Sequence, residues 1–230
     1  MSKLPFSVYD TFAYLASGLI VAVGVDHAFG LGFREAELGV VELLSGTVAL
    51  YVLGHLVAHL ASALLERLVI FRWLGRPEEQ LFGTKDKPLA AHLFRTYFRP
   101  FPREILERLG ERAAAEDMDR SGRGFFYLCR GVAQRDPIAR ERMASFLNLY
   151  GFCRNASLAF LACTLALLAA PLLARIGVVS STAPGWQWLG VGALMTSAGL
   201  FVRYLKFFRH YTMEAYLAVS ASEERKAGAA

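Results

Sequence analysis

The stretch NASLAFLACTLALLAAPLLA, residues 155–174, decides the fold class, because it runs uncharged between Arg154 and Arg175. A helix needs about 20 apolar residues to cross a bilayer. Three further stretches of similar character lie outward from it along the chain. They are residues 11–33, which are interrupted by Asp26, residues 43–65 and residues 186–202. We predict an all-α integral membrane protein with four transmembrane helices and a helical cytoplasmic insert between the second and third.

The composition excludes the common alternatives. The chain has 230 residues, of which 55% are hydrophobic and 20% charged, whereas a soluble domain has about 25% charged and about 45–50% apolar residues. Three cysteines without a Cys-x-x-Cys pair indicate neither a disulfide framework nor a thiolate metal site. The first apolar segment lacks a small-residue cleavage pattern, which indicates a retained span rather than a signal peptide.

The distribution of basic residues predicts the orientation. Most of the 25 Lys and Arg residues lie within 66–154, whereas the connections at 26–42 and 175–185 hold one arginine each. By the positive-inside rule, both termini and the insert are cytoplasmic. The arginines closest to the predicted spans agree with this orientation: Arg67, Arg72, Arg154 and Arg203.

We predict four parts in the chain. They are transmembrane helices 1 and 2 at 1–72, the ligand-binding insert at 73–147, transmembrane helices 3 and 4 with a basic amphipathic end at 148–222, and a flexible tail at 223–230.

Turn signals divide the insert into helical stretches. We expect these at 88–98, 102–117 and 123–135. Asp136 followed by Pro137 predicts an N-cap with proline at the first helical position, and one helix from 137 to 174. The basic end at 203–211 is interpreted as an inner-leaflet anchor or as a docking helix for the insert.

A polar stripe follows the second span. Its members fall within a helical sector of about 120° and are Thr47, Tyr51, His55, His59, Ser62 and Glu66. Polar side chains at membrane depth line a pore or bond neighbouring helices, and both interpretations stay open. A metal or haem between His55 and His59 is a weaker alternative, because no third ligand is evident.

Two features concern the outer side and helix packing. Asp26 and Glu42, with Glu35 and Glu37 between them, predict an acidic outer mouth or a solvated loop. The patterns Gly18-x-x-x-Ala22 and Gly192-x-x-x-Thr196 predict close helix packing.

Arginines alternate with aromatic residues in the insert. Guanidinium groups suit phosphates and aromatic faces suit unstacked bases, so the pattern predicts a single-stranded nucleic-acid site. Its candidate residues are Arg95, Arg99, Arg103, Arg120, Arg123, Arg130, Phe98 and Phe126. The alternative is that these arginines pair with nearby acids such as Glu104, Glu107, Glu111 and Asp119. No catalytic, cofactor or metal motif occurs in the sequence, so we predict neither an enzyme nor a bound cofactor.

Three short motifs carry a family resemblance: VYDTFAYL at 8–15, LYGF at 149–152 followed by Arg154-Asn155, and RYLKF at 203–207 followed by Arg209 and Tyr211. They resemble the membrane effectors of Hailong-type anti-phage systems, although Ser17 stands where that family's pattern has a proline. The resemblance covers the spans and not the insert. It implies a bacterial inner-membrane location, a homo-oligomer (a tetramer), and a nucleotidyltransferase partner whose short DNA oligomers hold the channel closed.

We therefore expect an oligomeric ion channel effector gated by a nucleic-acid or nucleotide signal bound to its cytoplasmic insert. The alternative is a non-channel membrane scaffold that recruits a cytoplasmic partner through the basic insert.

Overall fold

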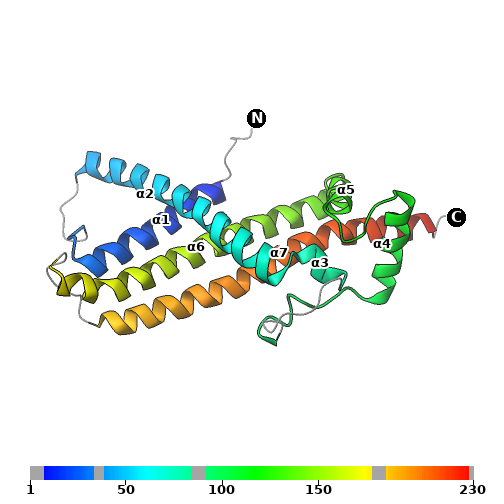
Figure 1. The fold of residues 1–230 in the computed structure, drawn as a ribbon. Helices are drawn as coiled ribbons and strands as arrows, with labels where there is room; N and C mark the ends of the chain where they lie inside the picture. Colours follow the sequence, from blue (N-terminus) through cyan, green and yellow to red (C-terminus); the bar gives the residue numbers. More distant parts are fainter. Residues whose placement is uncertain (1–7, 34–38, 84–91, 178–184, 228–230) are drawn as a thin grey trace. The chain divides into compact units, whose positions relative to one another are not determined.

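The computed structural model describes residues 8–33, 39–83, 92–177 and 185–227, and every regular element in these ranges is a helix (Figure 1). The elements are α1 (Val8–Phe29), α2 (Val40–Ala61), the π-helix η1 (Ser62–Leu74), α3 (Pro77–Leu81), α4 (Arg103–Ala115), α5 (Arg123–Ala133), α6 (Pro137–Arg175) and α7 (Trp186–Ala227). Four helical stretches are long and apolar enough to cross a membrane, namely Thr11–Phe29, Val40–Leu81, Pro137–Arg175 and Trp186–Glu224. The all-α class with four candidate spans is confirmed at this level.

The helix that begins at Pro137 is confirmed, including its cap. The Asp136 carboxylate accepts hydrogen bonds from the Ile138 and Ala139 amides, at 2.9 and 3.3 Å. These bonds satisfy amides that the first helical turn leaves without an intrahelical partner. The helix then continues to Arg175, with Pro171 inside it.

Two predicted stretches differ from the structure. A helix was expected over 88–98, but the described residues 92–98 form turns, and residues 88–91 lie outside the described part. The second span was expected as one α-helix to residue 65, whereas α2 ends at Ala61 and continues as η1. A π-helix has i→i+5 hydrogen bonds, so Ser62 and Glu66 no longer follow the 100° spacing of the stripe.

The chain divides into two compact units. We call residues 1–66 and 151–204 the apolar unit, and residues 67–150 and 205–230 the arginine-rich unit. These boundaries differ from the predicted ones, because the second half of α7 groups with the insert rather than with the spans.

In the apolar unit, α1 and α2 cross at two glycines. A Cβ added to Gly18 would lie 2.0 Å from the Leu50 carbonyl oxygen, and one added to Gly54 would lie 1.9 Å from that of Tyr14. Only glycine therefore permits this approach of the two backbones. Close packing was expected at Gly18 and is found there, but a Cβ on Gly192 would meet nothing within 4 Å in the described structure.

Polar groups join α6 to its neighbours within the apolar unit. The Ser157 hydroxyl donates to the Ser197 carbonyl at 2.9 Å, and the Ser197 hydroxyl donates to the Ser157 carbonyl at 2.8 Å. The Cys163 thiol donates to the Ile20 carbonyl at 3.2 Å on α1. Such interhelical hydrogen bonds are typical of helices that pack in lipid.

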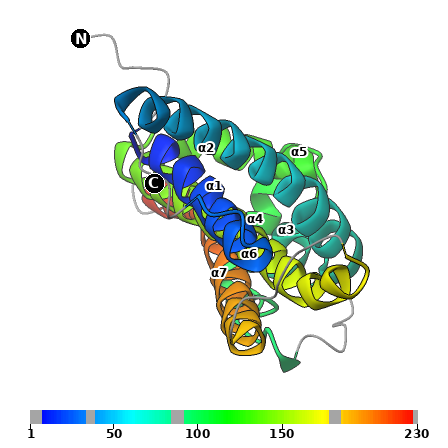
Figure 2. The ribbon, with the colours of Figure 1, turned by 90° about the vertical axis from the view of Figure 1, so that its left-hand side faces the viewer.

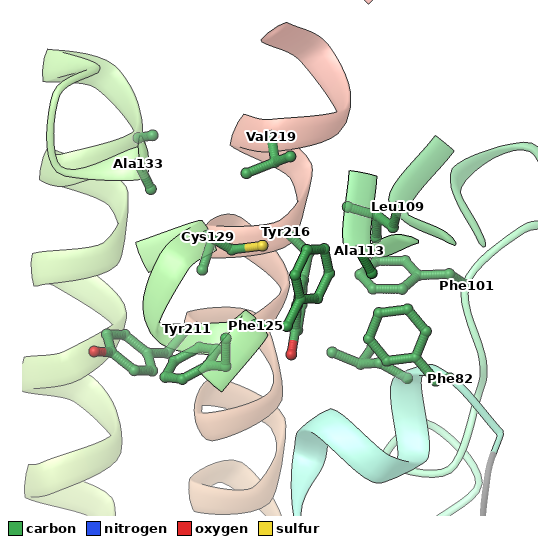
Figure 3. Packing of buried hydrophobic residues seen from close by; sticks show 14 of the residues in the cluster. Phe82, Phe101, Leu109, Ala113, Phe125, Cys129, Ala133, Tyr211, Tyr216 and Val219 are labelled. Carbon is green, nitrogen blue, oxygen red and sulfur yellow. The ribbon is translucent and has the colours of Figure 1, made fainter. Parts of the chain in front are cut away.

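In the arginine-rich unit, α3, α4, α5, α6 and the end of α7 surround an aromatic core (Figure 3). Tyr216 lies fully buried at its centre, with ring centroids of Phe82, Phe101 and Phe125 at 5.2–6.1 Å. Aromatic side chains bury the largest apolar area per residue, so this core can organise helices that are individually short. Of the predicted docking segment 203–211, Tyr211 belongs to this core and Phe208 packs against it, whereas Ala215, Tyr216 and Val219 extend the contact beyond the predicted segment.

Two hydrogen bonds fix the non-helical segment that precedes α4. The Tyr97 hydroxyl donates to the Gly75 carbonyl at 2.8 Å, and the Arg209 guanidinium donates to the Arg99 carbonyl at 2.6 Å.

Burial raises the pKa of Tyr97 well above its ordinary value. Burial also raises the pKa of Cys129 to about 12, so this core thiol is not a reactive thiolate at neutral pH.

Candidate functional sites

The polar stripe lies on the outer surface of α2. Thr47, His55 and His59 are exposed, and Tyr51 is half-buried. The Thr47 hydroxyl is satisfied by its own helix, where it donates to the Leu43 carbonyl at 2.8 Å. Both imidazoles are exposed, and among the described residues no hydrogen bond joins either of them to another helix. The interpretation as hydrogen-bonding glue within a single chain is therefore not supported for His55 and His59.

Tyr14 of α1 extends the stripe and was missed from the sequence. Its ring stacks on His55 with centroids 3.9 Å apart, and Tyr51 meets His55 edge-on at 4.6 Å. The crossing at Gly18 and Gly54 brings α1 close enough for this contact. The paired glycines are the signal that could have found Tyr14, since it lies one turn before Gly18.

The stripe ends at an ion pair. The Arg154 guanidinium lies 2.7 Å from the Glu66 carboxylate, with side chains only 15% and 19% exposed. Ser62 donates to the same carboxylate at 3.5 Å, and Arg154 also donates to the Asn155 side chain at 3.3 Å. In the sequence, Glu66 ends the polar stripe of the second span and Arg154 precedes the third span. Nothing in the sequence pattern indicated that the two residues pair.

Of the four acids predicted at the outer side, the structure describes Asp26 and Glu42. Asp26 is 3% exposed, and its carboxylate accepts a hydrogen bond from the Phe33 amide at 2.9 Å. This carboxylate therefore closes the end of α1 and does not face a mouth, which corrects the prediction for Asp26. Glu42 is exposed on the first turn of α2, whereas Glu35 and Glu37 lie outside the described residues.

A metal site on α2 finds no support in the described part of the chain. No group of three or more His, Cys, Asp or Glu residues suited to a metal ion occurs there. His55 instead contacts two tyrosine rings.

All six arginines of the predicted nucleic-acid site are exposed: Arg95, Arg99, Arg103, Arg120, Arg123 and Arg130. Arg103 pairs with Glu107 at 2.7 Å. Among the described residues, no ion pair joins the other five to a carboxylate, while Arg108 and Arg112 are paired with glutamates. Within the described ranges, the alternative that acids neutralise the arginines therefore applies to Arg103 and not to the other five.

The two phenylalanines of the predicted site face inward. Phe98 is 3% and Phe126 is 8% exposed, and Phe126 belongs to the aromatic core. Because a stacking surface must be accessible, we withdraw both from the site. Tyr127 is 58% exposed instead. It lies on α5 between Arg123 and Arg130, and the spacing of four and three residues places all three on one helix face.

Comparison with family models, curated proteins and solved structures gave no match to this chain. The resemblance to Hailong-type effectors therefore stays a prediction.

Proposed function

We propose that the protein is a homo-oligomeric channel in a bacterial inner membrane, with both termini and the arginine-rich unit in the cytoplasm. The observation that carries the proposal is the exposed stripe of Thr47, His55 and His59, beside Tyr51, on a helix long and apolar enough to span. Exposed imidazoles at membrane depth are costly against lipid and are found facing water-filled paths. Several copies arranged around an axis would give the stripe such a path.

The arginine-rich unit is proposed to bind the gating signal, a single-stranded DNA oligomer or nucleotide. Its support is the outward face of α5, where Arg123 and Arg130 flank the exposed ring of Tyr127. Guanidinium groups would contact phosphates, and the tyrosine ring would stack on one base. A role in anti-phage defence, and a nucleotidyltransferase that supplies the oligomer, are the parts of the proposal that rest on the resemblance alone.

The pore is tested by ion flux into liposomes that contain the purified protein. Replacing His55 and His59 together by leucine should strongly reduce flux, because it removes the polar lining at two successive turns. The matched control replaces Leu56 and Leu60 by valine, since both are exposed on the same helix but outside the stripe. Equal flux in the two double variants would contradict the assignment of the stripe.

The ligand site is tested with an arginine pair and a matched pair from the same unit. Arg123→Gln with Arg130→Gln should weaken binding of a short single-stranded DNA probe and flatten its salt dependence. Arg108→Gln with Arg112→Gln removes the same charge from arginines held in ion pairs, and should change binding less. Equal loss in both pairs would indicate only a response to net charge.

The alternative proposal is a membrane scaffold that recruits a cytoplasmic protein through the same α5 face. Absence of ion flux in liposomes, together with intact assembly and loss of a protein partner in the Arg123→Gln, Arg130→Gln variant, would favour the scaffold.

A further inference from the structure

A charged cavity of about 350 Å³ lies within the arginine-rich unit. Its wall is made by the start of α3 and by the residues that lead into α5, two short helices that α4 separates along the chain (Figures 1 and 2). Ligand pockets have about 300–1,000 Å³, so this cavity can hold one small molecule and not a whole oligomer. The charged and hydroxyl side chains of the wall are Arg76, Glu78, Glu79, Asp119, Ser121 and Arg123.

Two arginines of this wall are not neutralised by a carboxylate. The guanidinium carbons of Arg76 and Arg123 lie 4.8 and 5.9 Å from the ring centroid of Phe71. In the part of the chain that the structure describes, no ion pair joins either guanidinium group to an acid. A cation–π contact positions a guanidinium group but leaves its N–H groups able to donate. Two such groups in one cavity suit an anion such as a phosphate.

The three carboxylates of the wall differ in their hydrogen bonds. Asp119 accepts from the amide and the hydroxyl of Ser121, at 3.0 and 2.9 Å, and Glu79 accepts from the Arg76 amide at 3.0 Å. These two carboxylates therefore stabilise the wall itself. The buried Oε2 of Glu78, in contrast, has no hydrogen-bond partner among the described residues. Because buried polar atoms are nearly always hydrogen-bonded, Glu78 favours a ligand that brings an N–H or O–H donor.

The cavity thus favours a ligand with an anionic end and a donor end. A nucleotide that ends in a phosphate has both, since its base carries N–H groups. Arg123 also begins the exposed α5 face of Tyr127 and Arg130, so an oligomer that lies along this face would reach the cavity with one end.

We propose that the cavity binds a terminal nucleotide with a free phosphate, with Arg76 and Arg123 at the phosphate and Glu78 at an N–H group of the base. This site rests on the proposed function, because it receives one end of the proposed nucleic-acid ligand.

Small probes test the site in the full-length protein in detergent. Isothermal titration calorimetry compares inorganic phosphate with each of the four deoxynucleoside 5′-monophosphates. At least one mononucleotide should bind about tenfold more tightly than phosphate, because the base adds a hydrogen bond to a charged group. Equal binding of phosphate and all four mononucleotides would overturn the role of the base. The free amino acid glutamate also has an anionic end and a donor end, and binding of it in place of a mononucleotide would overturn the proposal.

Substitutions separate the two ends of the cavity. Arg76→Gln should weaken binding of phosphate and of the mononucleotide alike, by about tenfold, because a charged hydrogen bond is lost. Glu78→Leu should weaken only the mononucleotide, since leucine is similar in size but accepts no hydrogen bond. Arg140→Gln is the control, because Arg140 is exposed in the same unit and lies outside the cavity.

Melting temperatures establish that each variant is folded, and Arg123→Gln replaces Arg76→Gln if the latter does not fold. Equal effects of Arg76→Gln and Arg140→Gln, or mononucleotide binding unchanged by Glu78→Leu, would overturn the assignment of these residues.

The ends of an oligomer give a further test. Short single-stranded DNA probes carry a 5′-phosphate, a 3′-phosphate or no terminal phosphate. A terminal phosphate has a charge of about −1.5 to −2 at pH 7, so one of the two phosphorylated probes should bind about tenfold more tightly than the third. Arg76→Gln should abolish this difference, whereas Arg130→Gln should weaken all three probes alike, since Arg130 lies on α5 outside the cavity. Equal binding of the three probes to the unaltered protein would overturn the end site.

The cavity site and the proposed function fail separately. Oligomer binding that depends on Arg130, without preference for a terminal phosphate and without mononucleotide binding, would leave the proposed function standing and remove the cavity site. Mononucleotide binding that depends on Arg76 and Glu78, without oligomer binding, would leave the cavity standing and remove the oligomer as the gating signal.

Discussion

The apolar unit and the arginine-rich unit are both helical, yet they pack by different means. In the apolar unit, glycines set the α1–α2 crossing, one serine pair joins α6 to α7, and an ion pair joins α6 to the end of the second span. In the arginine-rich unit, a cluster of aromatic rings around Tyr216 joins five helices. Burial of apolar side chains stabilises a fold in water but gives little between helices in lipid, where backbone fit and polar bonds matter more. The interactions that hold each unit together are thus the ones expected for its proposed surroundings, lipid for the apolar unit and water for the arginine-rich unit.

The largest expected effect is loss of the aromatic centre. Tyr216→Ala should lower the unfolding free energy of the arginine-rich unit by about 3–5 kcal/mol, the range for deleting a buried ring. Tyr216→Phe should change it by less than about 1 kcal/mol, because the buried hydroxyl has no hydrogen-bond partner among the described residues. Thermal unfolding in detergent, followed by circular dichroism, measures both. Equal losses in the two variants would show that the hydroxyl, not the ring, organises this core.

A smaller effect is expected at the glycine crossing. Gly54→Ala should destabilise the apolar unit by about 1–3 kcal/mol, because the added methyl group meets the Tyr14 backbone and the helices must separate. Gly46→Ala lies on the same helix with open space at Cβ, and should instead stabilise by up to about 1 kcal/mol through helix propensity. Melting temperatures that fall together in both variants would contradict a close crossing.

The ion pair should contribute less again. We expect a coupling of about 1–2 kcal/mol between Glu66→Gln and Arg154→Met in a double-mutant cycle, because the pair is mostly buried and hydrogen-bonded. Each substitution should cost more stability in the wild-type protein than in the variant whose partner residue is already replaced. In the wild-type protein, it leaves one polar group without its partner. Additive effects of the two substitutions would show that the pair does not couple α6 to the end of the second span.

Long apolar stretches and capping residues were enough to predict helices from the sequence. Contacts between side chains on different helices were not predicted. The apolar run at 155–174 and the Asp136 cap were enough to define α6, because span length and capping are local properties. The Glu66–Arg154 pair and the Tyr14–His55 stack were not predicted, because each joins residues far apart in the sequence. Such contacts depend on how helices cross, which periodicity does not specify.

The candidate nucleic-acid site shows the same limit on one helix. The alternation of arginine with aromatic residues predicted that Phe126 would be accessible, yet the ring lies in the core and Tyr127 faces outward. On a helix, adjacent residues differ by about 100° in direction, so only one of the two could share the face of Arg123 and Arg130. The helical periodicity of α5 could therefore have predicted Tyr127, and not Phe126, as the exposed ring. The inward position of Phe98 could not be predicted in this way, because it depends on the non-helical segment before α4.

The smallest expected effect separates stability from binding at Arg103. Its ion pair with Glu107 is at the surface, with side chains 90% and 59% exposed, in contrast to the enclosed Glu66–Arg154 pair. Arg103→Gln should therefore change the unfolding free energy by less than about 0.5 kcal/mol, because solvent screens an exposed pair between neighbouring helical turns. If Arg103 also contacts a phosphate, the same variant should reduce the slope of log affinity against log salt for a single-stranded DNA probe by about 0.7. Glu107→Gln removes the same ion pair but leaves the arginine, so it should not reduce that slope. Loss of stability in both variants with an unchanged salt slope would assign Arg103 to the fold of α4 and remove it from the binding surface.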